Sequence, residues 1–185
     1  MEKTRRNTWT ASASELRRLK VLTACGMMCA LALVLNMTTT FNIGPYIRIG
    51  VSGIPSQVVD YLFGPVVGGI FGGVLDIVKY VLRPDGNFFP GFTISGIMGG
   101  MIYGTILYRQ RPTVLRILAA QAAVKTVVNI GLNSVWLHML YGQALAALLP
   151  ARCVSNLVML PVDTLILYLV LRVLDGPMKR ILAEE

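Results

Sequence analysis

The sequence predicts an all-α integral membrane protein, a six-transmembrane-helix bundle with ordered extracellular loops. Of the 185 residues, 55% are hydrophobic and only 14% are charged, and the mean hydropathy is +0.64. A soluble domain of this size does not need so many apolar residues to fill its core, so the expected solvent is lipid. Because about 20 mostly apolar residues cross the hydrocarbon layer, the chain has room for six or seven crossings and no soluble domain.

Six apolar segments account for this bundle. They lie at about 21–37, 54–63, 65–82, 93–108, 113–140 and 144–174. The second is too short to span alone, so we expect it to be tilted or sheltered by protein, and Gly64-Pro65 is expected to separate it from the third. Pro150 and Pro161 are expected to bend or divide the last segment.

The net charge of +8 is explained by orientation rather than by nucleic-acid binding. Lys and Arg flank the apolar runs instead of forming one polar face, as positive-inside sorting requires. Residues 1–19 are predicted to be a basic cytoplasmic segment and residues 20–185 the transmembrane domain. Both termini then lie in the cytoplasm, and the irregular stretches 38–48 and 83–92 lie outside as ordered loops.

Charges within the predicted helices stand out, because a lone charge at mid-membrane costs about 2.5 kcal/mol or more. Four are noted: Asp76, Lys79, Lys125 and Asp163. Asp76 and Lys79 share a helix face, where they can pair or hold a polar ligand. Lys125 and Asp163 both fall near mid-depth, so we hypothesise a structural ion pair, with a proton or ligand role as the alternative.

Small residues recur at three- and four-residue spacing on several segments, notably between Gly68 and Gly73 and between Gly96 and Gly104. Such faces let helix backbones approach closely, which favours packing within the bundle; the alternative is a flat surface for another membrane subunit. Gly26 and Ala30 are our candidates for that second role.

Catalysis and metal binding find no support in the sequence. The lone histidine, His138, has no second ligand at metal spacing, and no Ser or Cys has a His-carboxylate partner. By contrast, the predicted outer loops and helix ends hold groups suited to a flat, polar, anionic ligand. Aromatic side chains can stack on its ring, amides can hydrogen-bond to the edge of the ring, and arginines can bind its carboxylates. With Lys79, these candidates are Arg48, Arg83, Asn87, Phe88, Phe92, Thr93, Asn133, Trp136, Tyr141, Arg152 and Asn156. For Trp136 and Tyr141 an interfacial aromatic belt is the alternative.

Five sequence motifs in order resemble a known family. They are Ile47-Arg48-Ile49-Gly50, the run 61–68, Asp76-Ile77, the run 88–95 and the run 132–137. Together they are similar to the folate-type substrate-binding subunit (S component) of energy-coupling-factor (ECF) vitamin transporters, over about residues 21–174. The family pattern Leu-Asn-Thr-x-Trp-Leu has Ser134 in place of Thr here, which keeps the hydroxyl.

The resemblance implies a six-helix receptor in a bacterial plasma membrane that captures folate or a reduced folate from outside. It implies no cofactor in this chain, because a transmembrane coupling (T) subunit and two cytoplasmic ATPases supply the ATP-driven step. It places Gly26 and Ala30 at the docking motif of the first helix and residues 88–93 in the loop that caps the substrate. Which of Arg48, Arg83 and Arg152 would meet the glutamate carboxylates stays open.

Three other functions are alternatives to this one. An S component for thiamine, riboflavin or a pterin-like compound is the nearest; a cationic ligand would want carboxylates, and only Asp76 and Asp85 offer them on the outer side. A small intramembrane lipid-modifying enzyme should show an acid-base pair or a metal cluster, which is not seen. A purely structural assembly factor would not explain the one-sided polar and aromatic residues.

Overall fold

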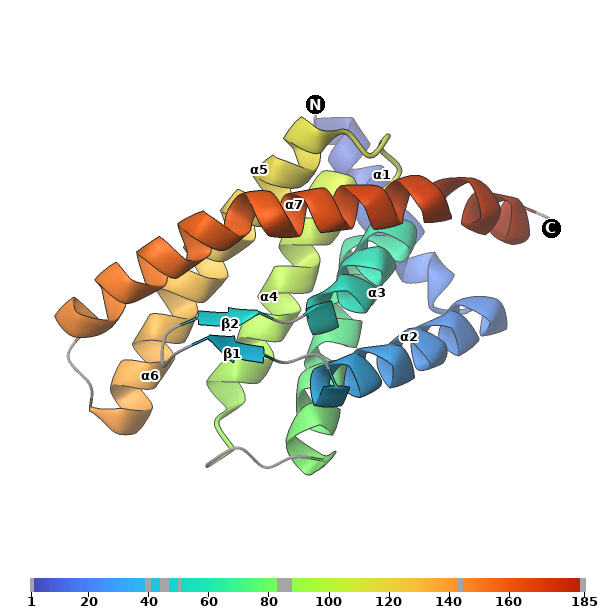
Figure 1. Cartoon of the computed structure of the whole chain (residues 1–185). Helices are drawn as coiled ribbons and strands as arrows, with labels where there is room; N and C mark the ends of the chain where they lie inside the picture. Colours follow the sequence, from blue (N-terminus) through green and yellow to red (C-terminus); the bar gives the residue numbers. More distant parts are fainter. Residues whose placement is uncertain are drawn as a thin grey trace.

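The computed structural model describes residues 2–38, 41–43, 47–49, 51–82, 88–142 and 145–183, and within them the chain is almost entirely helical (Figure 1). The helices are α1 (Glu2–Glu15), α2 (Leu19–Thr38), α3 (Ile54–Leu82), α4 (Pro90–Leu107), α5 (Val114–Val124), η2 (Lys125–Leu132), α6 (Asn133–Tyr141) and α7 (Leu145–Ala183). Four stretches are long and apolar enough to cross a membrane: Leu19–Thr38, Ile54–Leu82, Val114–Leu140 and Arg152–Leu174. The prediction of an apolar helical membrane protein is therefore confirmed.

Helix α3 is two helices joined at Gly64, whose φ of 87° and ψ of −171° lie outside the helical region. Gly53 and Lys79 line one cavity, although a straight helix would place them about 39 Å apart. The chain therefore turns back at Gly64, and Pro65 begins the second half, where a missing N–H costs nothing. The predicted separation at Gly64-Pro65 is confirmed, and the first half is largely buried, as its short length required.

Helix α1 covers this turn. The sequence predicts only a basic cytoplasmic segment over residues 1–19, but Ser12 is fully buried and its hydroxyl donates to the carbonyl oxygen of Phe63 at 2.6 Å. The same Oγ accepts the backbone N–H groups of Val66 at 3.1 Å and Val67 at 3.3 Å. Ser12 thus caps both helix ends at the break from a different helix, which satisfies groups that have no intrahelical partner.

The second half of α3 packs against α4 through glycines. A Cβ added to Gly72 would meet the carbonyl of Gly96, and one added to Gly100 would meet the carbonyl of Gly68. A Cβ on Gly104 would likewise strike the backbone of Pro65 at 2.5 Å. These glycines therefore serve packing within the bundle, which was the preferred interpretation of the pattern.

Three details differ from the sequence-based expectation. The stretch expected as an outer loop after residue 38 contains a short antiparallel hairpin, β1 (Phe41–Ile43) and β2 (Ile47–Ile49), followed by the 3-10 turn η1 (Val51–Gly53). Helix α4 starts at Pro90 rather than near 93. Helix α7 continues through Pro150 and Pro161 as one helix instead of being divided.

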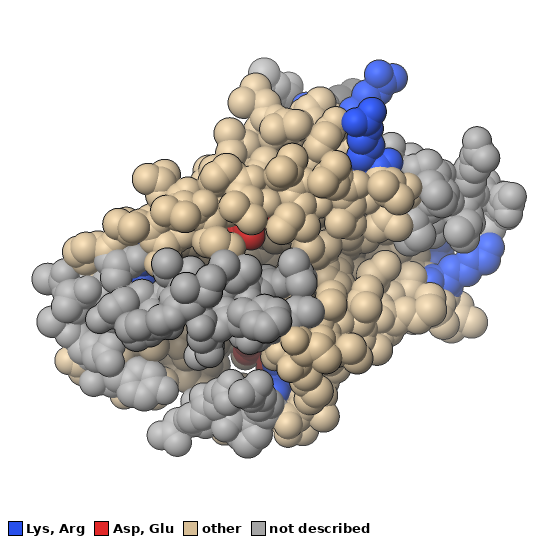
Figure 2. All heavy atoms as spheres, viewed as in Figure 1, with Lys and Arg blue, Asp and Glu red and all other residues tan. Residues whose placement is uncertain are grey.

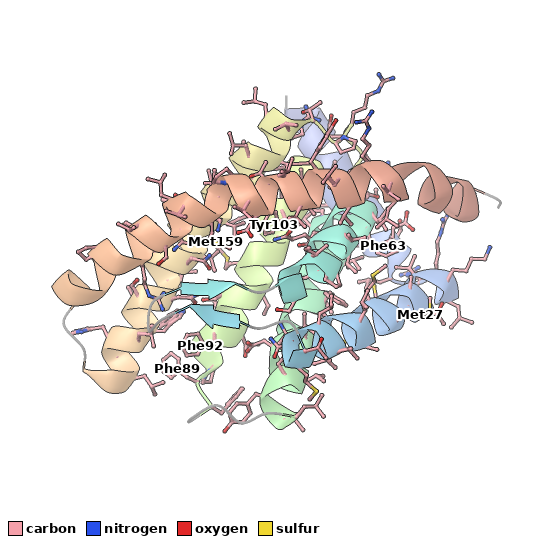
Figure 3. All side chains as sticks on the ribbon, in the orientation of Figure 1. Met27, Phe63, Phe89, Phe92, Tyr103 and Met159 are labelled. Carbon is pink, nitrogen blue, oxygen red and sulfur yellow. The ribbon has the colours of Figure 1, made fainter. Side chains whose placement is uncertain are left out.

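Two apolar clusters hold the bundle together. One joins α3, α4, α5 and α7 around residues such as Leu107, Ile117 and Leu171, and the other joins α2 to α3 around Phe63. Figure 3 shows Tyr103 near the middle of the molecule behind α7 and Phe63 beside α2. On the face drawn in Figure 2 the described surface is mostly neither acidic nor basic, and the blue Lys and Arg atoms lie mainly toward the upper right, as expected for a protein whose sides face lipid.

Candidate functional site

A cavity of about 360 Å³ lies between both halves of α3, α4 and the π-helical stretch η2. This volume is within the range of about 300–1,000 Å³ usual for small-molecule sites. Along α4 the lining runs from Phe92 to Tyr103, a distance of about 16 Å at the helical rise. Phe92 and Lys79 are partly exposed, whereas Asp60 and Tyr103 are buried. The cavity is therefore elongated, with one open and one closed end.

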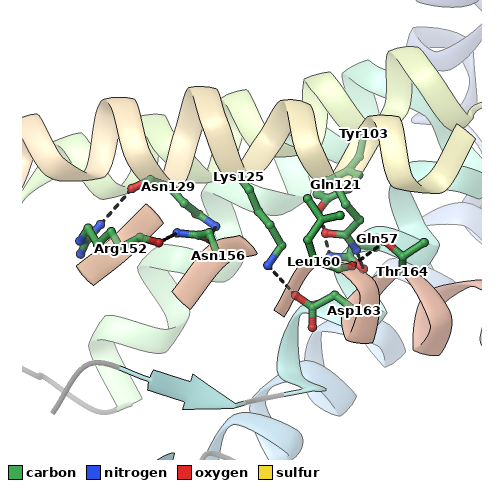
Figure 4. Close-up of polar contacts among 10 residues, drawn as sticks. All are labelled: Gln57, Tyr103, Gln121, Lys125, Asn129, Arg152, Asn156, Leu160, Asp163 and Thr164. Atoms are coloured by element: carbon green, nitrogen blue, oxygen red, sulfur yellow. Dashed lines mark hydrogen bonds and ion pairs between the residues drawn. The ribbon is translucent and has the colours of Figure 1, made fainter. Parts of the chain in front are cut away.

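Three side chains form a hydrogen-bonded ring at the closed end (Figure 4). The Tyr103 hydroxyl donates to Gln121 Oε1 at 2.6 Å, Gln57 Nε2 donates to Tyr103 Oη at 3.2 Å, and Gln121 Nε2 donates to Gln57 Oε1 at 3.5 Å. The ring ties α3, α4 and α5 together. Because each member is bound by the others, Gln57 and Tyr103 present fixed polar atoms to whatever fills this end.

Asp60 also lines the closed end. Its residue is 1% exposed, and its Oδ1 has no hydrogen-bond donor among the described residues. The carboxylate lies against Gly68, where a Cβ would collide with Oδ1. The absence of a side chain at position 68 therefore makes the room in which the carboxylate sits.

The open end holds one charged group of each sign. Lys79 lines it one helical turn from Asp76, so the two side chains lie on the face of α3 that looks into the cavity. The Thr93 hydroxyl donates to Asp76 Oδ2 at 2.8 Å and holds that carboxylate between α3 and α4. An ammonium group at the mouth is suited to a ligand carboxylate.

The wall opposite α3 is formed by η2, in which Asn133 N–H bonds to the carbonyl of Val128, five residues earlier. Such wide turns leave main-chain groups to be satisfied elsewhere, and Arg152 from α7 donates to the carbonyl of Asn129 at 2.9 Å (Figure 4). Asn129 and Asn133 both line the cavity. Asn133 Oδ1 is buried and has no donor within the described chain.

An aromatic cluster closes the side of the cavity near the start of α4. Phe89 packs against Phe92 at 6.0 Å and against Trp136 at 5.7 Å between ring centroids. The Trp136 indole N–H donates to the Ser95 hydroxyl at 3.1 Å, which joins α6 to α4. Phe92 is the member that lines the cavity, and Figure 3 shows it together with Phe89 toward the lower end of α4.

A family model for the substrate-specific component of ECF transporters matches residues 20–171. The chain belongs to this family. It is accordingly the substrate-binding part of a transporter and not an enzyme, and the family resemblance drawn from the sequence is confirmed.

Individual relatives agree with the assignment. The S component is 32% identical over 153 residues to a protein named folate transporter FolT from Clostridium novyi, covering 83% of this chain and 88% of that one. It is 29% identical over 178 residues to a folate transporter FolT from Leuconostoc mesenteroides, covering 92% of each. A crystal structure of FolT bound with folic acid superposes with a TM-score of 0.75 at 28% identity, over 83% of this chain and 93% of that one.

The cavity of this S component contains only part of the set predicted from sequence. Three predicted residues line it: Lys79, Phe92 and Asn133. Thr93 does not line it but donates a hydrogen bond to Asp76, which does. Other predicted residues lie nearby without lining it: Trp136 in the aromatic cluster, Phe88 against Tyr80 at 5.0 Å, and Arg152 and Asn156 behind η2. Arg83 and Asn87 and the side chains of Arg48 and Tyr141 lie outside the described residues.

The residues at the closed end of the cavity were not among the binding residues predicted from the sequence. Asp60 stands in the run Val58-Val59-Asp60-Tyr61, so it was visible as a charge inside a segment already predicted to be helical and sheltered by protein. The same test that selected Asp76 and Lys79 would have selected it. Gln57, Tyr103 and Asn129 gave no comparable signal, because uncharged polar residues in helices have many possible roles.

Proposed function

We propose that this S component captures folate or a reduced folate from outside the cell. The observation that carries the proposal is the elongated cavity, which has an ammonium group at its open end and fixed polar groups at its closed end. Folate has the complementary layout, with a polar bicyclic pterin at one end and a glutamate with two carboxylates at the other. The names of the relatives support the same ligand.

In this proposal the glutamate lies toward Lys79 and the pterin lies toward Gln57, Asp60 and Tyr103. The aromatic ring of Phe92 packs on the ligand near the open end, and Asn133 contributes an amide to the lining. Buried aromatic surface supplies most of the affinity and the polar groups supply orientation. Phe92 lines the cavity at the start of α4, which supports the proposal that residues 88–93 cover the ligand.

The chain is proposed to span a bacterial plasma membrane six times, through α2, the two halves of α3, α4, the continuous α5–η2–α6 and α7. Both termini are cytoplasmic, because the helix ends at Arg17, Arg18 and Lys20 and at Arg109 and Arg111 then lie on the inside. The cavity opens toward the outside in this orientation. The stretches before α3 and before α4 become extracellular loops.

ATP-driven uptake is proposed to depend on a transmembrane coupling (T) subunit and two cytoplasmic ATPases, with no cofactor in this chain. Gly26 and Ala30 are exposed on α2, and a Cβ added to Gly26 meets nothing within 4 Å. This open face of small residues supports docking of the T subunit on α2, since small residues let helices approach closely.

The test is calorimetric titration of the purified chain in detergent with folate, thiamine and riboflavin. Selective, saturable binding of folate is expected. Thiamine is the instructive comparison, because both Asp60 and Asp76 line the cavity and a cationic vitamin would need such carboxylates. Binding of thiamine without binding of folate would reassign the ligand.

A further inference from the structure

The turn between α4 and α5 gathers positive charge that the proposed function uses only to orient the chain. We call residues 108–116 the basic turn, because it contains Arg109, Arg111 and Arg116 and no acidic residue. Arg109 and Arg111 are exposed, and neither forms an ion pair with a carboxylate of the described residues. Like charges that are not neutralised within the chain attract an anionic partner from outside it.

The backbone of the basic turn is strained at one of these arginines. Arg109 has a φ of 56°, a left-handed conformation that glycine or asparagine adopts at lower cost. Its guanidinium lies 5.1 Å from the centroid of the Tyr108 ring, which favours one direction of the side chain. Because strain of this kind is typical of functional positions, it favours a binding role for Arg109.

Packing and side-chain contacts support the rest of the basic turn. Arg116 donates to Gln110 Oε1 at 2.6 Å, so the start of α5 is tied back to the turn. Tyr108 is buried, and a Cβ added to Gly64 would lie 3.0 Å from both the Tyr108 ring and Ser12. The basic turn therefore rests on the place where α1 meets the break in α3, and its guanidinium groups are carried by a packed support.

A second basic segment lies beside the basic turn. Arg17 and Arg18, between α1 and α2, are exposed, and Arg18 is close enough to Tyr108 to act on it electrostatically. Arg18 contacts Glu15 at 3.7 Å, so this carboxylate offsets only part of the charge. Figure 1 shows α1 and the start of α5 at the same end of the bundle. The two segments together form one basic surface at that end.

Exposed apolar side chains stand next to these cations. Leu115 directly precedes Arg116 and is 77% exposed. Leu19 lies between Arg18 and Lys20 and is 76% exposed. A soluble anion offers nothing to such side chains, whereas a phospholipid joins a phosphate to acyl chains, and the arginine fork can bind two phosphate oxygens at once. The combination of arginine and exposed leucine therefore favours a lipid.

We propose that the basic turn, with the neighbouring Arg17 and Arg18, binds the headgroup of an anionic phospholipid. Arg109 and Arg111 hold the phosphate, and the acyl chains lie along Leu115. The site is at the end of the bundle that the proposed orientation places in the cytoplasm, where the leaflet carries anionic lipid. No residue of the basic turn lines the cavity, so the site does not depend on which vitamin is captured.

The test is a titration of the purified full-length chain in detergent with dioleoyl-phosphatidylglycerol. Dioleoyl-phosphatidylcholine is the reference, because it has the same acyl chains and no net charge. Native mass spectrometry measures the bound lipid, and wild type is expected to bind phosphatidylglycerol roughly tenfold more tightly and to melt at a higher temperature with it. Equal binding of the two lipids would overturn the inference. Displacement of the lipid by inorganic phosphate at the same concentration would assign a soluble anion instead.

Variants locate the site on the surface. Arg109→Gln should lower the preference for phosphatidylglycerol to less than about threefold, and Arg109→Lys should fall between it and wild type, since lysine keeps the charge but not the fork. The matched control is Arg172→Gln, which removes one charge from an exposed position on α7 and should keep the wild-type preference. Equal losses in the two Gln variants would show a diffuse attraction to anionic lipid, which contradicts a defined site.

Three controls keep the result interpretable. Without added lipid every variant should melt close to wild type and bind folate equally well, because the changed side chains are exposed. If Arg109→Gln does not fold, Arg111→Gln carries the same expectation, and an unchanged lipid preference in the variant that folds would overturn the inference. Unchanged lipid binding with lost assembly on the coupling subunit would assign the turn to a protein contact. Failure of wild type to bind folate would overturn the proposed function alone.

Discussion

The Nζ atom of Lys125 lies 2.7 Å from Oδ2 of Asp163, and this ion pair joins the π-helical stretch η2 to α7 (Figure 4). The side chains are 9% and 32% exposed. The ion pair hypothesised from the depth of the two residues in their helices is therefore present. Neither residue lines the cavity, so the pair fixes the wall formed by η2 from behind.

Replacing Lys125 or Asp163 with Ala should lower the free energy of unfolding by about 1–4 kcal/mol, between the values for exposed and for buried pairs. For a chain of this size each kcal/mol corresponds to a shift of about 2–4 °C in the melting temperature. The exchange Lys125→Asp with Asp163→Lys should restore part of the loss. Thermal melting in detergent checks both steps, and an absence of rescue would contradict a simple pairing role.

The cap that Ser12 provides at the turn in α3 predicts a strong effect from a small substitution. Ser12→Ala removes one donated and two accepted hydrogen bonds at a buried break, which should cost about 1–3 kcal/mol. Ser14→Ala is the matched control, because the exposed Ser14 bonds only to the carbonyl of Ala11 in its own helix. Equal melting temperatures for the two variants would argue against the cap.

Much of this architecture could be predicted because membrane helices are specified locally. Apolar run lengths located the helices, and Gly64-Pro65 marked the turn in α3. The contacts between helices were harder to predict from the sequence. Nothing in the basic segment 1–19 indicates that Ser12 reaches across to α3, and the ring of Gln57, Tyr103 and Gln121 forms from three helices whose rotation about their axes the sequence does not specify.

The residues of the site likewise divide into those that the sequence could predict and those that it could not. Lys79 and Asn133 were found because charges and amides in apolar helices are conspicuous, and Asp60 was equally conspicuous but was overlooked. Arg152 was selected as a ligand for carboxylates, yet it bonds to the carbonyl of Asn129. A widened turn in η2 creates that need, and helical periodicity does not reveal such a turn.

The crossing of α3 and α4 predicts intolerance of side chains at Gly72. Gly72→Ala would place a methyl group against the carbonyl of Gly96, and overpacking of this kind costs about 1–3 kcal/mol. Gly26→Ala is the control, since its Cβ meets nothing within 4 Å and Ala favours helix. Thermal melting should therefore separate the two variants; a stable Gly72→Ala protein would show that the helices can move apart freely.

The position of Lys79 at the cavity mouth predicts which part of the ligand it binds. Lys79→Met should weaken folate binding by roughly 10- to 100-fold, as expected for loss of a charge-assisted hydrogen bond. Pteroate, which lacks the glutamate and keeps a single carboxylate closer to the pterin, should lose clearly less affinity than folate. Calorimetric titration of the two ligands checks this, and equal losses for folate and pteroate would place Lys79 away from the glutamate.

The open face of α2 predicts a variant that separates recognition from transport. Gly26→Leu adds a bulky side chain where neighbouring atoms are absent, so the isolated chain should fold and bind folate as wild type does. If α2 is the surface that meets the coupling subunit, the same side chain blocks the close approach that small residues permit. Co-purification with the coupling subunit and the ATPases should then be lost, together with ATP-dependent uptake in proteoliposomes. Retained assembly would move the docking surface to another helix, whereas loss of folate binding by the isolated chain would mean that α2 shapes the cavity as well.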